Sequence, residues 1–274
     1  MPSDDQASQD GRDHDGSLVL RSFGRVPTLS ASVWTAIVFG WIAIGTVALT
    51  PVVAGSGSTA TRDFVRDGLV RWPGALLLLV LLWKLRPNLP IDLTGGPKRP
   101  VWFPWATITL TVAALIRLTV VSQFWDEAGY TVATFFSEMS TGVFEELAFR
   151  GLVFGGLLFG FGSSRGGVRK ALLLTTVLFG LVHGASGIPA VIVTLLFGAV
   201  FLLSTLELRS LWPAAVLHGL FDVGVNGAAP VGESAWNETL MAFASVALLL
   251  GGIVALVFFG LWNRWPVVPD QSGP

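Results

Sequence analysis

The sequence predicts an all-α membrane protein, a polytopic bundle of about eight transmembrane helices around a polar intramembrane cavity. Three observations support this fold class. Apolar residues make up 52% of the 274 residues, whereas charged residues make up only 13%, about half of the roughly 25% that is usual in soluble domains. The apolar residues form long runs separated by short charged gaps. The few ionisable residues inside those runs gather in three clusters.

Eight apolar runs are each close to the length of about 20 residues that a membrane helix needs. In chain order they cover residues 32–53, 69–85, 102–121, 131–159, 168–183, 188–206, 211–225 and 240–262. The fourth run is the longest and carries the first polar cluster, and the seventh is short. Residues 1–28 are rich in Asp, Ser, Gln and Gly, so they are expected to form a disordered cytoplasmic tail. The transmembrane domain is then expected over residues 29–265, followed by a short tail at 266–274.

The charges between the runs predict an orientation. If the chain crosses the membrane eight times, most Lys and Arg residues outside the runs fall on one side, together with both termini. The other side carries only Arg62, Arg66 and Arg71. Because positively charged loops remain in the cytoplasm, both termini are expected there, in a multi-pass protein of the plasma membrane.

Composition also bounds the partners. A net charge of −1 leaves no basic surface for nucleic acid, so the expected partner is the lipid bilayer. The chain has no cysteine, which excludes disulfides, thiolate metal sites and a cysteine nucleophile. The basic residues are mostly Arg, and Ala, Gly and Val are abundant, which is compatible with a bacterium of high genomic GC content.

Three polar clusters lie within the apolar runs. They consist of Glu145, Glu146 and Arg150; of Phe179 and His183; and of His218 and Asp222. Ionisable groups at membrane depth are costly, so each cluster is interpreted as part of a functional site with a nearby partner. Each also places residues four apart, on one face of a helix. Acid and imidazole groups from three helices that face a common interior are the components of a hydrolytic centre.

In the first cluster the two adjacent acids, Glu145 and Glu146, point in different directions from the helix. Glu146 and Arg150 are four apart and can form a salt bridge along the helix. Glu145 lies about 100° around the helix from Glu146, because a turn holds about 3.6 residues. Glu146 can therefore be held by Arg150 while Glu145 faces another group, as general-base chemistry requires. The alternative is a buried ion pair that only locks helix packing.

Apart from His14 in the tail, His183 and His218 are the only histidines. Two mechanisms fit them. In the first, Glu145 or Glu146 joins His183 and His218 as the three protein ligands of a catalytic Zn²⁺. In the second, which needs no metal, a glutamate and one histidine activate water while the other histidine donates to the oxyanion. A purely structural role for both histidines is the third option.

The remaining polar positions have supporting roles. Asp222 shares a helix face with His218 and can orient its imidazole. Asn226, one turn further along, is expected to cap the helix, and Phe179 is expected to pack beside the site. No HExxH motif is present, which excludes an ordinary zincin arrangement.

The three motifs together resemble the CPBP family of intramembrane proteases, named for CAAX proteases and bacteriocin-processing enzymes. Abi proteins and the eukaryotic type II CAAX prenyl endopeptidase belong to this family. Its pattern of EExxxR, then FxxxH, then HxxxN or HxxxD occurs here in that order, from Glu145 to Asp222. The resemblance covers residues 135–222 and places a protease core at about residues 101–225.

The resemblance implies an endopeptidase that cuts a peptide bond of a membrane-associated protein or peptide. It implies that Glu145 and His183 activate the attacking water and that His218 stabilises the oxyanion. Asp222 replaces the more usual asparagine, and an ionised carboxylate cannot donate a hydrogen bond. The family is usually classed as metalloprotease, although a metal-free glutamate mechanism has been argued, so Zn²⁺ remains one of two options here.

Two other functions compete with proteolysis. Some relatives are similar to non-proteolytic membrane scaffolds or bacteriocin-immunity proteins. Intramembrane Glu, His and Asp residues also serve as ion relays in transporters. No internal repeat is evident, which disfavours an inverted-repeat transporter.

Overall fold

The computed structural model describes residues 40–41, 64, 68–85, 104–121, 128–162, 164–226 and 235–261. Within these ranges the chain is helical apart from short turns, with no strand, which confirms the all-α prediction. Both predicted tails and nearly all of the first apolar run lie outside the described residues.

The other seven runs coincide with helices. These are α3 (Leu69–Leu85), α4 (Trp105–Val121), α5 (Ala128–Glu146) with its continuations η4 (Leu147–Val153) and α6 (Phe154–Phe161), α7 (Arg165–Leu181), α8 (Ile188–Leu208), α9 (Trp212–Asn226) and α10 (Ala235–Leu261). The segments Ile188–Leu208 and Thr239–Phe259 are long and apolar enough to cross a membrane, and Leu69–Trp83 and Trp105–Val120 are shorter apolar helices. The eight crossings therefore stay a prediction.

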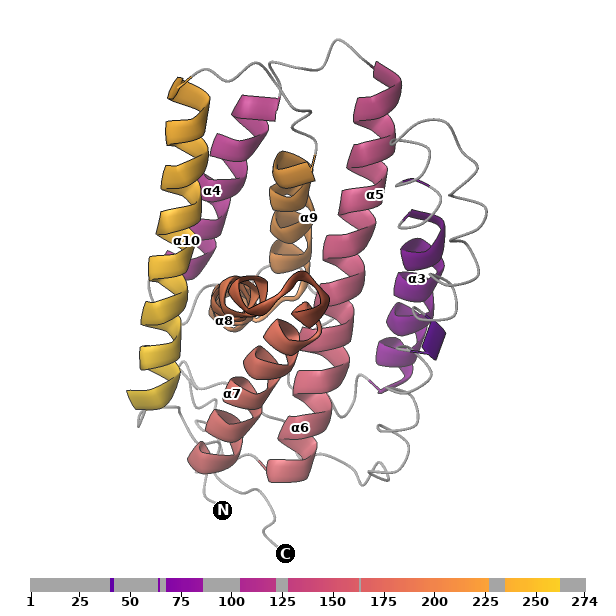
Figure 1. The fold of residues 1–274 in the computed structure, drawn as a ribbon. Coiled ribbons are helices and arrows are strands. Elements are labelled where there is room, and N and C mark those ends of the chain that lie inside the picture. Colours follow the sequence, from indigo (N-terminus) through magenta and orange to yellow (C-terminus); the bar gives the residue numbers. More distant parts are fainter. Residues whose placement is uncertain are drawn as a thin grey trace, which may run out of the picture.

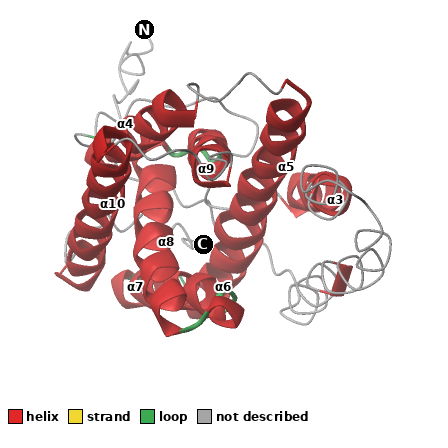
Figure 2. Ribbon diagram, turned by 45° about the horizontal axis from the view of Figure 1, so that its top comes forward, coloured by secondary structure: helices red, strands yellow, loops and turns green. Residues whose placement is uncertain are grey.

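Helices α7, α8 and α9 do not run side by side. Figure 1 shows α8 nearly end-on between α7, which fills the lower half of the bundle, and α9, which fills the upper half. In Figure 2 the same α8 is seen along its length between α10 and the pair α5 and α9. The turns before and after α8 are therefore near mid-height of the bundle, and the turn before it is exposed.

The second half of α8 forms the centre of the core. Every residue from Gly198 to Glu207 is buried, so this stretch is surrounded by other helices. Its last buried residue, Glu207, accepts hydrogen bonds from the backbone nitrogens of Ala106 (3.0 Å) and Thr107 (2.9 Å). These N–H groups belong to the first turn of α4, where a helix has no internal acceptors and attracts negative charge. Glu207 thereby fixes the start of α4 against α8.

Helices α5 and α9 cross with their backbones in contact. A Cβ atom added at Gly142 on α5 would overlap the backbone of Gly219 on α9. A Cβ at Gly219 would in turn overlap Met139. Only glycine permits this approach. The crossing brings the end of α5, with its two acids, next to His218.

Candidate active site

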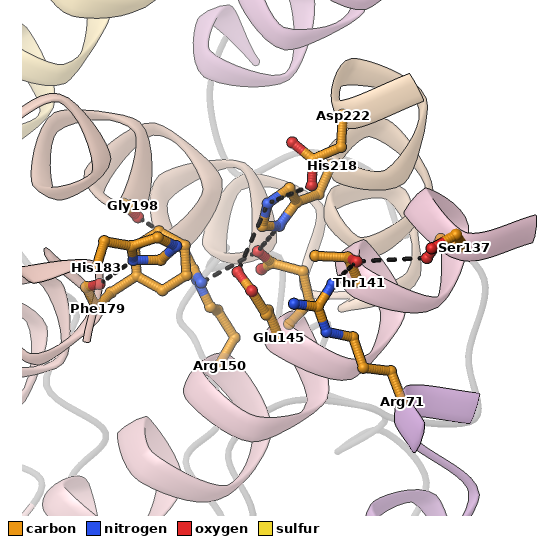
Figure 3. A network of polar contacts seen from close by, with 11 residues as sticks. Arg71, Ser137, Thr141, Glu145, Arg150, Phe179, His183, Gly198, His218 and Asp222 are labelled. Carbon is orange, nitrogen blue, oxygen red and sulfur yellow. Dashed lines mark hydrogen bonds and ion pairs between the residues drawn. The ribbon is translucent and has the colours of Figure 1, made fainter. Parts of the chain in front are cut away.

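The first and third polar clusters meet at the crossing of α5 and α9. Glu145 and Glu146 are the last residues of α5, and Arg150 lies in the π-helical turn η4 that follows. His218 and Asp222 lie one turn apart on α9. Figure 3 shows their side chains pointing toward one another from these two helices.

Glu146 is held by two partners at once. Its Oε1 atom lies 3.1 Å from Arg150 Nη1 and 2.8 Å from His218 Nδ1, and its side chain is fully buried. The predicted pairing of Glu146 with Arg150 is therefore present. Because a carboxylate paired with a guanidinium can only accept, we assign the proton of this contact to His218 Nδ1. Glu146 thus sets which nitrogen of His218 faces the rest of the site.

Arg150 joins three helices. Its Nη2 atom donates to the carbonyl oxygen of Gly198 on α8 at 2.9 Å. Its guanidinium also lies 4.4 Å from the ring centroid of Phe179 on α7. The π-helical turn is a common feature of functional sites, because it changes the direction of the side chains that follow. Arg150 consequently fixes Glu146 relative to both α7 and α8.

The imidazole of His218 is held between rings as well as between acids. It stacks on Phe201 of α8, with centroids 4.3 Å apart and ring planes at 20°. Phe179 contacts it edge-on, with centroids 6.1 Å apart. These contacts leave the ring little freedom to rotate, so its Nε2 atom has a defined direction.

That Nε2 atom faces the two remaining acids. It lies 3.4 Å from Asp222 Oδ2 and 3.8 Å from Glu145 Oε2. The side chains of Glu145 and Asp222 are 16% and 18% exposed, whereas that of Glu146 is 0% exposed. Of the two adjacent glutamates, Glu145 is therefore the one that water and substrate can reach.

His183 lies beside this cluster without a direct polar contact to it. It occupies the turn after α7, and its Nδ1 atom is 2.9 Å from the carbonyl oxygen of Phe179. The centroid of the Phe179 ring is 5.1 Å from that of His183, so both imidazoles contact the same phenyl ring. Phe179 is thus a packing residue beside the site, as predicted.

The predicted metal ligands do not form one set. Within the described ranges, no three His, Asp or Glu side chains are grouped so that they could hold a metal ion. The Nδ1 atom of His183 is bonded to the carbonyl oxygen of Phe179, and no direct polar contact joins this histidine to Glu145 or His218 within the described residues.

Sequence reasoning missed the contribution of Arg71. The charge pattern placed Arg71 with the loop charges Arg62 and Arg66, but it lies on α3 and donates from Nη1 to Thr141 Oγ1. Thr141 precedes Glu145 by one turn on α5, so Arg71 lies at the edge of the site, as Figure 3 shows. The apolar α8 also gave no signal for the roles of Gly198 and Phe201.

A family model described as Type II CAAX prenyl endopeptidase Rce1-like matches residues 127–224. This finding confirms the resemblance to the CPBP family of intramembrane proteases, and the match contains all six predicted site residues. Helices α3, α4 and α10 lie outside it. Comparisons with curated proteins and with solved structures found no match. Together with the two long apolar helices, the family match indicates a membrane protein with CAAX-type protease activity on peptide or protein substrates.

Proposed function

We propose that the chain is an intramembrane endopeptidase that hydrolyses a peptide bond with water activated by Glu145 and histidine. The observation that carries the proposal is the pair of Glu145 and His218. These groups come from two different helices, and their nearest charged atoms are 3.8 Å apart. The histidine is oriented by a buried acid, Glu146, which is itself fixed by Arg150.

Glu145 is the general base of this proposal. A separation of 3.8 Å is too long for a direct hydrogen bond, but one water molecule can bond to both Glu145 Oε2 and His218 Nε2. Glu145 removes a proton from this water as the oxygen attacks the carbonyl carbon of the substrate. The proton then passes to the leaving amine when the carbon–nitrogen bond breaks.

His218 is the proposed oxyanion donor. Its Nδ1 proton is directed to Glu146, so Nε2 carries a proton only when the ring is an imidazolium. In that form Nε2 can donate to the carbonyl oxygen as negative charge develops on it. Asp222 Oδ2, 3.4 Å from Nε2, forms an ion pair with the ring when the ring is an imidazolium. Asp222 therefore orients the imidazole and does not itself contact the oxyanion.

His183 is proposed as the second partner of the water once substrate is bound. Its Nδ1 atom faces the carbonyl of Phe179, so Nε2 is the nitrogen available for catalysis. Catalytic hydrogen bonds are often long without substrate and shorten in the substrate complex. Glu145 and His183 together are thus still proposed to activate the attacking water.

The test is cleavage by purified protein in lipid vesicles, with two probes: a prenylated peptide ending in CAAX and an unmodified transmembrane peptide. Wild type is expected to cleave at least one probe. Glu145→Gln and His218→Ala are expected to lose cleavage by about a hundredfold or more. Glu238→Gln is the matched control, because it makes the same change on α10, which carries none of the site residues.

Cleavage of both probes at equal rates by wild type and Glu145→Gln would remove Glu145 from the mechanism. A non-proteolytic scaffold would instead be favoured if wild type cleaves neither probe and if Glu145→Gln restores the phenotype of cells that lack the protein as fully as wild type does. Repeating the assay after dialysis against a zinc chelator tests metal assistance. Because His183 does not join the other two candidate ligands, cleavage is expected to survive that treatment.

A further inference from the structure

Asp222 adds a negative charge to a site that already holds two glutamates. The third motif more usually ends in a neutral asparagine, and the three motifs supply only one arginine, Arg150. That arginine is already paired with Glu146. His218 Nε2, 3.4 Å from Asp222, is shared with Glu145. Three carboxylates therefore face one guanidinium and one imidazole, and further positive charge from elsewhere in the chain stabilises ionised Asp222.

Arg117 of α4 lies against the segment of α9 that carries Asp222. Its guanidinium is 4.1 Å from the ring centroid of Phe221, the residue before Asp222. A Cβ atom at Gly224 would overlap Arg117, so the two helices are in close contact here. Arg117 and Asp222 are close enough to interact electrostatically. These contacts place Arg117 against the turn of α9 that carries Asp222.

The charge of Arg117 is not neutralised by its hydrogen-bond partner. The side chain is only 6% exposed, and Nη2 donates to the neutral hydroxyl of Ser245 on α10 at 2.9 Å. Its Nε atom has no hydrogen-bond partner within the described part of the chain. A buried arginine of this kind also needs a counter-charge.

We propose that Arg117 is a positioning residue that compensates the charge of Asp222, and thereby holds Asp222 where it orients His218. Arg71 of α3 interacts electrostatically with Asp222 as well and supplies a second, more exposed positive charge. Both arginines lie outside the segment 127–224 that matches the family. The negative charge of Asp222 is thus compensated by arginines on α3 and α4, two helices outside the segment that matches the family.

A double-mutant cycle on thermal unfolding tests the pair without requiring any activity. The variants are Arg117→Met, Asp222→Asn and their combination, in the full chain in detergent. Arg117→Met removes one of the positive charges near Asp222, Asp222→Asn removes the counter-charge of Arg117, and the double variant removes both members of the pair. Asp222→Asn is therefore expected to be more favourable for the unfolding temperature in the Arg117→Met background than in wild type. An equal change in the two backgrounds would contradict the proposal, because it would show that the two residues act independently.

Cleavage provides the second readout, and this arm rests on the proposed function. Arg117→Met is expected to lower cleavage on the order of tenfold, and Asp222→Asn is expected to cost less cleavage in the Arg117→Met background than in wild type. Arg117→Lys, which keeps the charge, is expected to lose less than Arg117→Met. Ser245→Ala is the control, since it removes the hydrogen-bond partner of Arg117 but no charge.

The outcomes separate this proposal from the proposed function. If wild type cleaves neither probe, the proposed function fails and the unfolding cycle still decides whether the pair exists. If Arg117→Met does not fold, recovery of folded protein by adding Asp222→Asn supports the pair, and continued failure contradicts it. If wild type cleaves and Asp222→Asn has the same effect with and without Arg117 in both readouts, the compensation proposal is wrong.

Discussion

Glu145 and Glu146 are adjacent in the chain but have different environments. Glu146 is fully buried and shares one oxygen between Arg150 and His218. Glu145 is partly exposed, and its nearest charged neighbour is 3.8 Å away. A buried acid that is paired with a guanidinium and an imidazole stabilises the fold. An accessible acid that pairs with no guanidinium within the described residues can take a proton from water. The two substitutions to glutamine should therefore have different consequences.

Glu146→Gln is expected to lower both stability and cleavage. It leaves Arg150 as a buried charge without its counter-ion, which typically costs about 3 kcal/mol or more of unfolding free energy. It also removes the charge that holds the proton on His218 Nδ1. Glu145→Gln, in contrast, should lose cleavage with little change in stability. Thermal unfolding and cleavage of both variants, measured side by side, check this; equal destabilisation by the two would contradict the assigned roles.

At the scale of the elements, the crossing of α5 and α9 determines whether the site forms. The two helices are in backbone contact at Gly142 and Gly219. Glu146 and His218 lie one turn or less from those glycines, so any separation of the backbones acts directly on the 2.8 Å contact between Oε1 and Nδ1. Gly142 and Gly219 therefore determine whether Glu146 can orient His218.

Gly142→Ala is expected to separate α5 from α9, because the new Cβ atom would overlap the backbone of Gly219. Overpacking of this kind costs about 1–3 kcal/mol, and cleavage should fall with it because Glu146 and His218 move apart. Gly160→Ala on α6 is the matched control, since nothing lies within 4 Å of its added Cβ. That change should be neutral or stabilising by up to about 1 kcal/mol. Similar unfolding temperatures for the two variants would show that the crossing is not tightly packed.

The arrangement of the whole molecule explains how polar groups reach the middle of an apolar bundle. Helix α7 ends and α9 begins near mid-height, with α8 running across between them (Figure 1). His183 follows the end of α7, and His218 lies in the second turn of α9. A helix that crossed the entire bundle would place its end residues at the surface. The transverse α8 instead leaves both histidines near mid-height, with His218 buried and His183 half-buried beside an exposed turn.

The orientation of the bundle can be tested because the chain has no cysteine. The positive-inside rule predicts that the turn between α6 and α7 faces the cytoplasm and that the start of α5 faces the opposite side. In intact cells, a membrane-impermeant maleimide is expected to label Ala128→Cys. Gly166→Cys, where an added Cβ meets nothing within 4 Å, should be labelled only after permeabilisation. The reverse pattern would overturn the predicted orientation but not the site.

The sequence by itself determined the helical class, the position of seven apolar helices and the six residues that the family match contains. It could do so because hydrophobic runs and a spacing of four residues are local properties of the chain. Only the tertiary structure decided which groups meet. It joined Glu146 to His218 and left His183 bonded to the carbonyl oxygen of Phe179. It also brought in residues that the motifs do not include, namely Arg71, Arg117, Gly198 and Phe201. These contacts depend on crossing angles and backbone approach between distant helices, which no local pattern in the sequence encodes.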